Sequence, residues 1–151
     1  MADNATNYLE TQLLSMFFNA TSIAGICDND ATSPITSFSI QLHTASPTDT
    51  GDLTAAEATY TGYARVGVER TSSGWTVTGS SAVTGSVSPT TTISFPQCSG
   101  GTNTITHFSI GNSTVAASTG IMYIYGTVTP NISVSNGVTP RLTTATAITI
   151  T

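Results

Sequence analysis

The sequence predicts a mainly β protein: an antiparallel β-sandwich or a jelly-roll-like barrel with one N-terminal α-helix. Several short runs alternate apolar and polar residues and are rich in Ile, Val, Thr and Tyr, the residue types that favour strands. Clusters of Gly, Pro, Asn and Ser separate these runs at short intervals, as in antiparallel folds. With 151 residues, of which 38% are hydrophobic, we expect one β domain over 1–151. Within it, 1–34 forms a helix and linker that can act as an assembly arm.

The N-terminal helix rests on a cap and an apolar stripe. Asn7 is placed to cap it, with Glu10 three residues later, and the helix should end near Asn19. Leu9, Leu13, Met16 and Phe17 recur at helical spacing. The stripe either packs on the domain's own sheet or docks partly on a neighbouring subunit. In the second case the candidate assembly interface is Leu9, Leu13, Phe17 and Phe18.

The strand predictions follow the alternating runs. They cover 37–44, 63–70, 75–77, 91–95, 104–110, 121–128 and 145–151. Residues 121–128 are apolar on both faces and are therefore predicted to form a central strand. Two stretches look irregular, 25–34 and 46–61. The second is the better candidate for a projecting loop, since long unstructured connections are usually functional or disordered.

The charge content is exceptionally low. Only 7% of residues are charged, there is no lysine, and about a third of all residues are Ser or Thr. Soluble domains usually carry ~25% charged residues and use them to stay apart. A chain without them is expected to pack against copies of itself or within a larger assembly. Three scattered arginines and a net charge of -5 argue against a nucleic-acid partner.

No catalytic, metal or cofactor site is predicted. His43 and His107 are the only histidines and both fall in predicted strands, where a local hydrogen bond explains them. The segment Asp28-Asn29-Asp30 resembles the start of a calcium loop, but Ser33 and Ser39 stand where that loop needs Gly and an acid. Cys27 and Cys98 could form a disulfide, but synthesis in a cytosol favours two thiols, at least partly buried. No apolar run reaches the ~20 residues of a membrane span, and no secretory signal is seen, so synthesis in a host cytoplasm is expected.

Ordered motifs along nearly the whole chain resemble a known family. They are NYLE with Leu13-Leu14, LHTASP followed by Gly51, GYARV, ISFP, ITHFSI, YGTVT and the final ITI. Together they resemble small virion proteins of tailed bacteriophages, commonly labelled tail-fibre or minor structural proteins. The chain departs from that pattern in its long Thr/Ser-rich middle, residues 71–92.

The resemblance implies a non-enzymatic structural protein of the virion. We expect first a capsid decoration (cement) protein, because the layout is compact and no shaft repeat is visible. Its partners would be the major capsid protein and copies of itself, most simply as a homotrimer, on the capsid surface. The alternatives are a tail-fibre or tail-tip component involved in host attachment, and a carbohydrate-binding β-sandwich.

Overall fold

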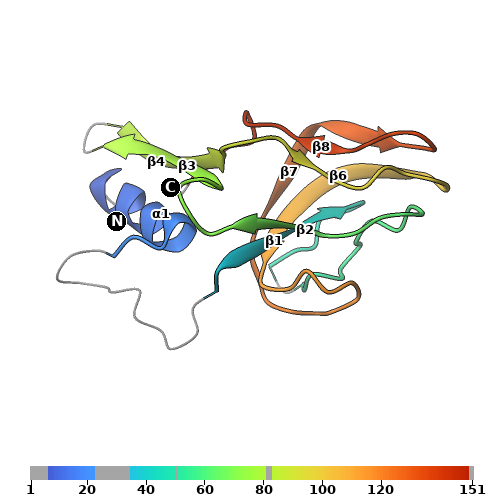
Figure 1. The fold of residues 1–151 in the computed structure, drawn as a ribbon, viewed down its shortest axis with the longest axis horizontal. Helices are drawn as coiled ribbons and strands as arrows, with labels where there is room; N and C mark the ends of the chain where they lie inside the picture. The colour runs from blue at the N-terminus through green and yellow to red at the C-terminus, as the bar shows by residue number, and fades with distance from the viewer. Residues whose placement is uncertain (1–6, 23–34, 50, 81–82, 150–151) are drawn as a thin grey trace. The chain divides into compact units, whose positions relative to one another are not determined.

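The computed structural model describes residues 7–22, 35–49, 51–80 and 83–149. It is mainly β, with one helix near the N-terminus and an antiparallel arrangement in each strand pair whose register is defined. This confirms the predicted fold class and is consistent with a β-sandwich (Figure 1). The elements are α1 Asn7–Asn19, β1 Ser37–His43, β2 Val66–Glu69, β3 Trp75–Ser80, β4 Val83–Pro89, β5 Ile93–Ser94, β6 Asn103–Gly111, β7 Met122–Val134, β8 Arg141–Leu142 and β9 Ile148–Thr149.

Within the described residues the strands form three sheets, ordered β2-β1-β6-β7, β3-β4-β9 and β5-β8. The chain divides into two compact units, each built from separated segments. We call Met1–Thr36, Glu69–Thr92 and Leu142–Thr151 the helical unit, and Ser37–Val68 with Ile93–Arg141 the sheet unit. That 1–151 is a single domain stays a prediction.

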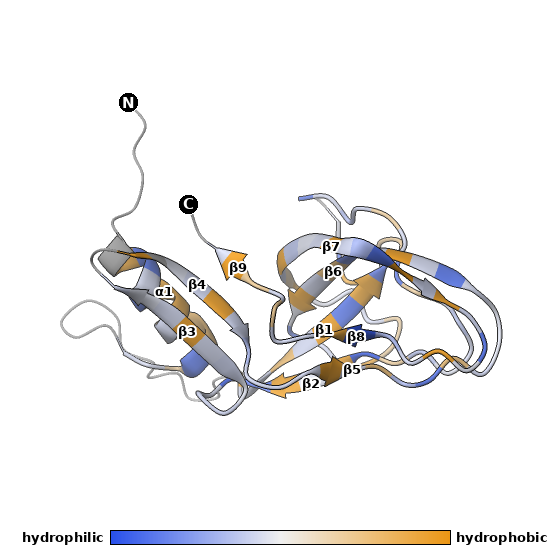
Figure 2. Cartoon of the chain, turned by 90° about the horizontal axis from the view of Figure 1, so that it is seen from above, coloured by the Kyte–Doolittle hydropathy of each residue, from blue (hydrophilic) through white to orange (hydrophobic). Residues whose placement is uncertain are grey.

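In the helical unit, α1 packs on the β3-β4 hairpin (Figure 1). Leu14 and Phe18 are fully buried, and the Phe18 ring lies 4.8 Å from the ring of Trp75, centroid to centroid. The hairpin itself is mostly Thr, Ser and Gly, and Figure 2 shows β3 and β4 in pale colours broken by narrow apolar bands. The unit's core therefore depends on a few large side chains, several of them supplied by the helix.

Glycines bring the helix close to the hairpin. A Cβ at Gly79 would come within 2.2 Å of the Thr11 hydroxyl, and one at Gly85 within 2.9 Å of the Thr11 backbone nitrogen. The close approach lets the buried Glu10 carboxylate accept a hydrogen bond from the Gly85 N–H at 3.1 Å. Glu10 was expected to act at the helix cap; the structure gives its carboxylate this partner on β4.

The other end of α1 is held by an arginine. The Arg70 guanidinium donates to the carbonyl oxygens of Phe17 and of Met16, the latter at 2.6 Å. These carbonyls lie in the last turn, where a helix leaves acceptors unpaired and carries partial negative charge. The prediction that the helix ends at Asn19 is confirmed.

In the sheet unit, β1 and β6 are the inner strands. β1 is buried on both faces over Phe38–His43. One face carries Phe38, Ile40 and Leu42, as predicted. The other carries Ser39, Gln41 and His43, which are at most 1% exposed. β6 adds Ile105, Phe108 and Ile110 to the core.

Several predictions are wrong in detail. Residues 121–128 were expected to form a central strand, but β7 is the last strand of its sheet, with Thr127 and Thr129 exposed. Residues 46–61 do not project as a loop: Leu53, Ala58 and Tyr60 in this segment are buried. The irregular stretch 25–34, which contains Cys27 and the calcium-like segment Asp28-Asn29-Asp30, lies outside the described residues.

Some predicted strands are shorter than expected. Residues 63–70 give only the four residues of β2, and 91–95 only the two of β5. Residues 145–151 give β9, of two residues, within the part of that run that the structure describes. No helix in the described part is long and apolar enough to cross a membrane.

Candidate functional site: a buried polar cluster beneath an exposed loop

A buried ion pair forms the centre of the sheet unit's polar cluster. Arg65 binds Glu57 through both carboxylate oxygens, with Nε to Oε1 at 2.7 Å and Nη2 to Oε2 at 2.8 Å. The Arg65 side chain is fully buried and that of Glu57 is 12% exposed. The Tyr63 hydroxyl donates to Glu57 Oε1 at 3.0 Å and accepts from the Leu42 N–H at 3.1 Å. Tyr63 thereby links Glu57, in the segment 46–61, to β1.

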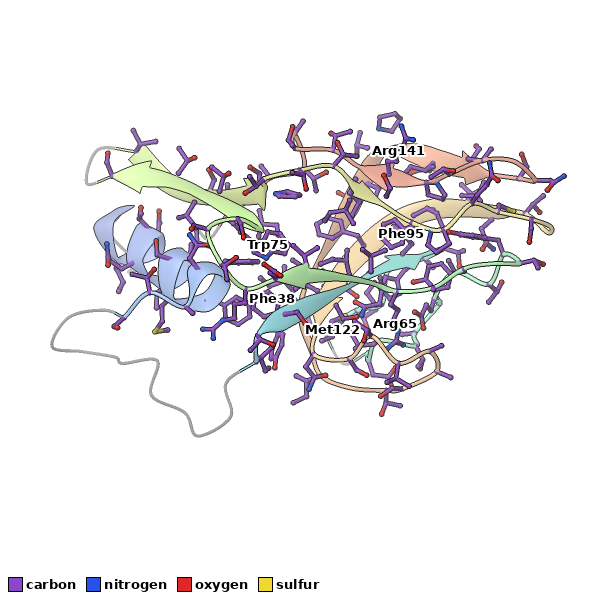
Figure 3. All side chains as sticks on the ribbon, in the orientation of Figure 1. Phe38, Arg65, Trp75, Phe95, Met122 and Arg141 are labelled. Atoms are coloured by element: carbon purple, nitrogen blue, oxygen red, sulfur yellow. The ribbon has the colours of Figure 1, made fainter. Side chains whose placement is uncertain are left out.

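Arg65 also fixes the connection between β6 and β7. Its Nη1 donates to the carbonyl of Ser113 and its Nη2 to that of Ser118, both at 3.0 Å. The Leu53 N–H donates to the Thr119 carbonyl at 3.1 Å. The Ile121 N–H donates to the Asn112 side-chain oxygen at 2.7 Å. Figure 3 marks Arg65 within the sheet unit.

The same connection, residues 112–121, is uncharged and exposes two large apolar side chains. We call it the 112–121 loop. Val115 is 67% exposed and Ile121 56% exposed. Leu53 packs beneath it, and a Cβ at Gly120 would come within 2.7 Å of the Leu53 side chain. The loop thus presents apolar groups from a backbone held by buried side chains, an arrangement suited to contact with another surface.

The polar face of β1 forms a second part of the cluster. His43 Nδ1 lies 2.8 Å from the Ala55 carbonyl oxygen, and its Nε2 lies 2.7 Å from the Ser109 hydroxyl. Ser109 donates to Gln41 Oε1 at 3.0 Å, and the Gln41 amide contacts the Ser39 hydroxyl. Ser39 in turn donates to the Ser113 carbonyl at 2.6 Å. The chain of polar groups runs from the segment 46–61 to the 112–121 loop.

Burial sets the electrostatics of the cluster. Desolvation lowers the pKa of His43 below its ordinary value, partly offset by the Ala55 carbonyl and by Glu57. The hydrogen bonds to Glu57 raise the pKa of Arg65. Desolvation raises the pKa of Tyr63, and it raises that of Tyr60 to about 12. Tyr60 donates to the Pro96 carbonyl at 2.9 Å.

The Ser109–His43 pair has the spacing of a nucleophile and its base, and the Ala55 carbonyl orients the imidazole. Both side chains are completely buried, however, so no substrate reaches Ser109. The pair therefore serves to satisfy buried polar groups. His107 bonds locally to the Thr106 hydroxyl at 2.8 Å, as expected for a strand histidine.

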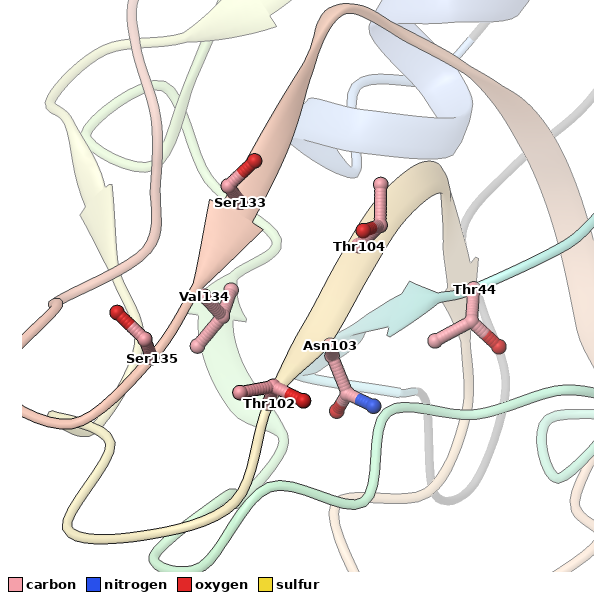
Figure 4. A pocket seen from close by; sticks show the side chains of 7 residues that line it. All are labelled: Thr44, Thr102, Asn103, Thr104, Ser133, Val134 and Ser135. Atoms are coloured by element: carbon pink, nitrogen blue, oxygen red, sulfur yellow. The ribbon is translucent and has the colours of Figure 1, made fainter.

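A separate open hollow of about 590 Å³ lies where β1 and β7 end and β6 begins (Figure 4). Its lining is neutral: Thr44, Thr102, Asn103, Thr104, Ser133, Val134 and Ser135. The Asn103 side-chain oxygen is already used by the N–H groups of Thr59 and Tyr60, at 2.8 and 2.9 Å. Within the described residues, no group of three or more His, Cys, Asp or Glu side chains is placed to hold a metal ion.

The four predicted interface residues all lie on α1 but differ in exposure. Phe18 is fully buried against Trp75, and Leu9 is 39% exposed. Leu13 and Phe17 are half-buried. Their role in assembly stays a prediction. The Cys98 thiol is buried and donates to the Gly100 carbonyl at 3.2 Å.

Sequence reasoning missed the Glu57–Arg65–Tyr63 cluster. Glu57 falls in the segment 46–61 that was predicted to be irregular, and Arg65 falls in the predicted strand 63–70. One signal was available, because Arg65 is one of only three cations and lies within the GYARV motif.

Comparison with known protein families finds a match that covers nearly the whole chain. The model of a family described as the podophage GP4 fiber I protein gp80 matches residues 4–151. The chain therefore belongs to this family of phage fibre proteins, and its resemblance to tail-fibre and minor structural proteins is confirmed. A comparison with curated proteins finds no match.

Proposed function

We propose that this member of the fibre family is a non-enzymatic component of a fibre on the phage tail, involved in host attachment. The observation that carries the proposal is the family match over residues 4–151. It supports a virion structural role directly. Its fibre description favours the tail over the capsid decoration role that the compact layout had suggested.

The site chemistry supports a structural role as well. The buried polar side chains of the sheet unit are used in holding segments together, and the Ser–His pair is closed to solvent. The outward features are an uncharged loop with exposed Val115 and Ile121, and a neutral hollow, both suited to contact with other molecules.

We further propose that the protein works as a homo-oligomer, most simply a homotrimer. The support is the low charge of the chain, which allows copies to pack without repulsion. Within the described part of α1, Leu9 is the predicted interface residue most available for a neighbouring protein. Sedimentation of the purified protein tests this proposal, and a protein that remains monomeric at micromolar concentration contradicts it.

The location is tested on particles. Antibody labelling in electron microscopy, together with copy number per virion from quantitative mass spectrometry, should place a small number of copies at the tail. Particles lacking the protein should keep their DNA on heating but adsorb poorly to host cells. Hundreds of copies on the head, or heat-labile heads with normal adsorption, would instead support the decoration role.

A further inference from the structure

Ser109 and His43 are closed to substrates from solvent, but an acyl group lies beside them within the fold. It is the side-chain amide of Gln41, which like Ser109 and His43 is fully buried. Gln41 on β1 and Ser109 on β6 are direct partners in the antiparallel pair, so their side chains meet on one face. The Ser109 hydroxyl donates to Gln41 Oε1 at 3.0 Å. A hydroxyl, a base and a carbonyl group are therefore enclosed together.

The neighbours of Gln41 determine which way its amide faces. Its Nε2 donates to the Ser39 hydroxyl and contacts the Ser113 carbonyl oxygen at 3.5 Å. A carbonyl oxygen only accepts, so the amide nitrogen belongs on this side and Oε1 on the side of Ser109. Because a C=O bond is about 1.23 Å long, Gln41 Cδ lies within about 4.2 Å of Ser109 Oγ. Small side-chain rotations bring these atoms to the ~3–3.5 Å from which a nucleophile attacks.

His43 is oriented to accept the hydroxyl hydrogen. Its Nδ1 lies 2.8 Å from the Ala55 carbonyl oxygen, which only accepts, so the neutral imidazole carries its hydrogen on Nδ1. Nε2 is then an unprotonated base, 2.7 Å from Ser109 Oγ. Burial lowers the pKa of His43, so the imidazole is neutral at pH 7. Glu57 favours the imidazolium that forms when Nε2 takes up a proton.

We propose that Ser109 and Gln41 form an ester cross-link between β6 and β1, with His43 as the base. Ser109 Oγ attacks Gln41 Cδ while the hydroxyl hydrogen passes to His43 Nε2. The C–N bond of the tetrahedral intermediate then breaks, and the amide nitrogen takes the hydrogen from Nε2 and leaves as ammonia. One C–O bond replaces one C–N bond, His43 returns to its neutral form, and no further reactant enters the balance.

The fold suits the product as well as the reaction. The cross-link places four bonds between the two Cβ atoms, which reach about 5 Å when extended. Residues directly opposite in an antiparallel pair have Cβ atoms about 4.5–5.5 Å apart. The burial of the three side chains keeps water from hydrolysing the ester. Each molecule reacts once, so a slow reaction suffices, and the product ties together the two inner strands of the sheet unit.

The test is mass spectrometry of the intact protein and of its tryptic peptides. With three arginines and no lysine, trypsin places Gln41 in the peptide that ends at Arg65 and Ser109 in the peptide 71–141. The wild-type mass should be lower by one ammonia, and the two peptides should stay joined after unfolding and digestion. Hydroxylamine, which cleaves esters, should separate them. Separate peptides from the untreated protein overturn the proposal, and so does an ammonia loss confined to one peptide.

A matched pair of variants assigns the bond. Ser109→Ala removes the nucleophile and should abolish the joined peptides. Ser133→Ala, at an exposed position on β7, is the control and should retain them. Joined peptides in Ser109→Ala overturn the proposal. Fragment spectra of the joined wild-type peptides do not depend on any variant folding: they should locate the bond between Gln41 and Ser109, and a bond between other residues overturns the proposal.

Discussion

The two units reach stability by different means. The helical unit buries a small apolar core, in which Phe18 and Leu14 of α1 meet Trp75 on a hairpin of Thr, Ser and Gly. The sheet unit adds to its apolar core a buried network of charged and polar side chains around Arg65. Large apolar side chains contribute by area and tolerate imperfect geometry, whereas buried charges stabilise only when every partner is present. The helical unit should thus respond most to lost volume, and the sheet unit to lost partners.

The largest effect is expected from Phe18→Ala in the helical unit. Removing this fully buried ring should lower the free energy of unfolding by about 3–5 kcal/mol. Trp75, the only tryptophan, lies against Phe18 and reports this unit by fluorescence during chemical unfolding. Leu9→Ala, on the same helix but 39% exposed, is the control and should cost under about 1 kcal/mol. Equal losses would show that α1 does not carry the core.

A somewhat smaller effect is expected from Arg65→Met in the sheet unit. The substitution keeps much of the side-chain volume but leaves Glu57 without its ion partner, at a cost of about 2–4 kcal/mol. Amide exchange of β1 and of 112–121 measures the loss in this unit. Arg141→Met removes the same charge from an exposed position and should be nearly neutral. Adding Glu57→Gln to Arg65→Met should recover part of the loss; no recovery would mean that the arginine acts by packing alone.

An intermediate effect is expected from Glu10→Ala in the helical unit. It leaves the buried Gly85 N–H without its acceptor, which should cost about 1–3 kcal/mol. Glu69→Ala, at an exposed position, is the matched control. Unfolding followed by Trp75 fluorescence provides the measurement. A loss no larger than that of the control would indicate that this buried polar contact adds nothing to a core of apolar side chains.

The smallest expected effect is a loss of stability in alkaline solution. It should distinguish the two units, because the tyrosines responsible lie in the sheet unit. Burial raises the pKa of Tyr60 to about 12 and also raises that of Tyr63, so the folded sheet unit keeps both hydroxyls protonated where the unfolded chain loses them. Above about pH 10 the unfolded state therefore binds fewer protons, and stability falls as pH rises from 10 toward 12. Amide exchange in the sheet unit should show this loss, and Tyr60→Phe should reduce it. Equal alkaline sensitivity in Trp75 fluorescence would contradict a unit-specific cause.

The elements that could be predicted from the sequence are those marked by a local periodicity of apolar residues. The helix stripe ending at Asn19, and the alternation of Phe38, Ile40 and Leu42 on β1, both gave the correct elements. The opposite face of β1 was misleading, because Ser39, Gln41 and His43 have the pattern of a solvent-facing surface. Their burial depends on partners far along the chain, which alternation does not encode.

The same limit explains the missed cluster and the misplaced central strand. Glu57 and Arg65 meet through a bidentate contact between two irregular segments, and no periodic pattern marks such a contact. Residues 121–128 are apolar enough for a central position, but strand order is set by pairing with β6. The one local sign of this contact was Arg65 itself, because an arginine in a chain with so few charged residues suggests a specific acidic partner.

The interleaving of the two units has a consequence for how the protein is made. The chain passes from one unit to the other after residues 36, 68, 92 and 141. Because synthesis proceeds from the N-terminus at about 5–20 residues per second, α1 and the β3-β4 hairpin leave the ribosome long before β9, which pairs with β4. The sheet unit, whose last segment ends at Arg141, has all its strands available earlier. The helical unit therefore becomes complete only after the last segment of the sheet unit has been made.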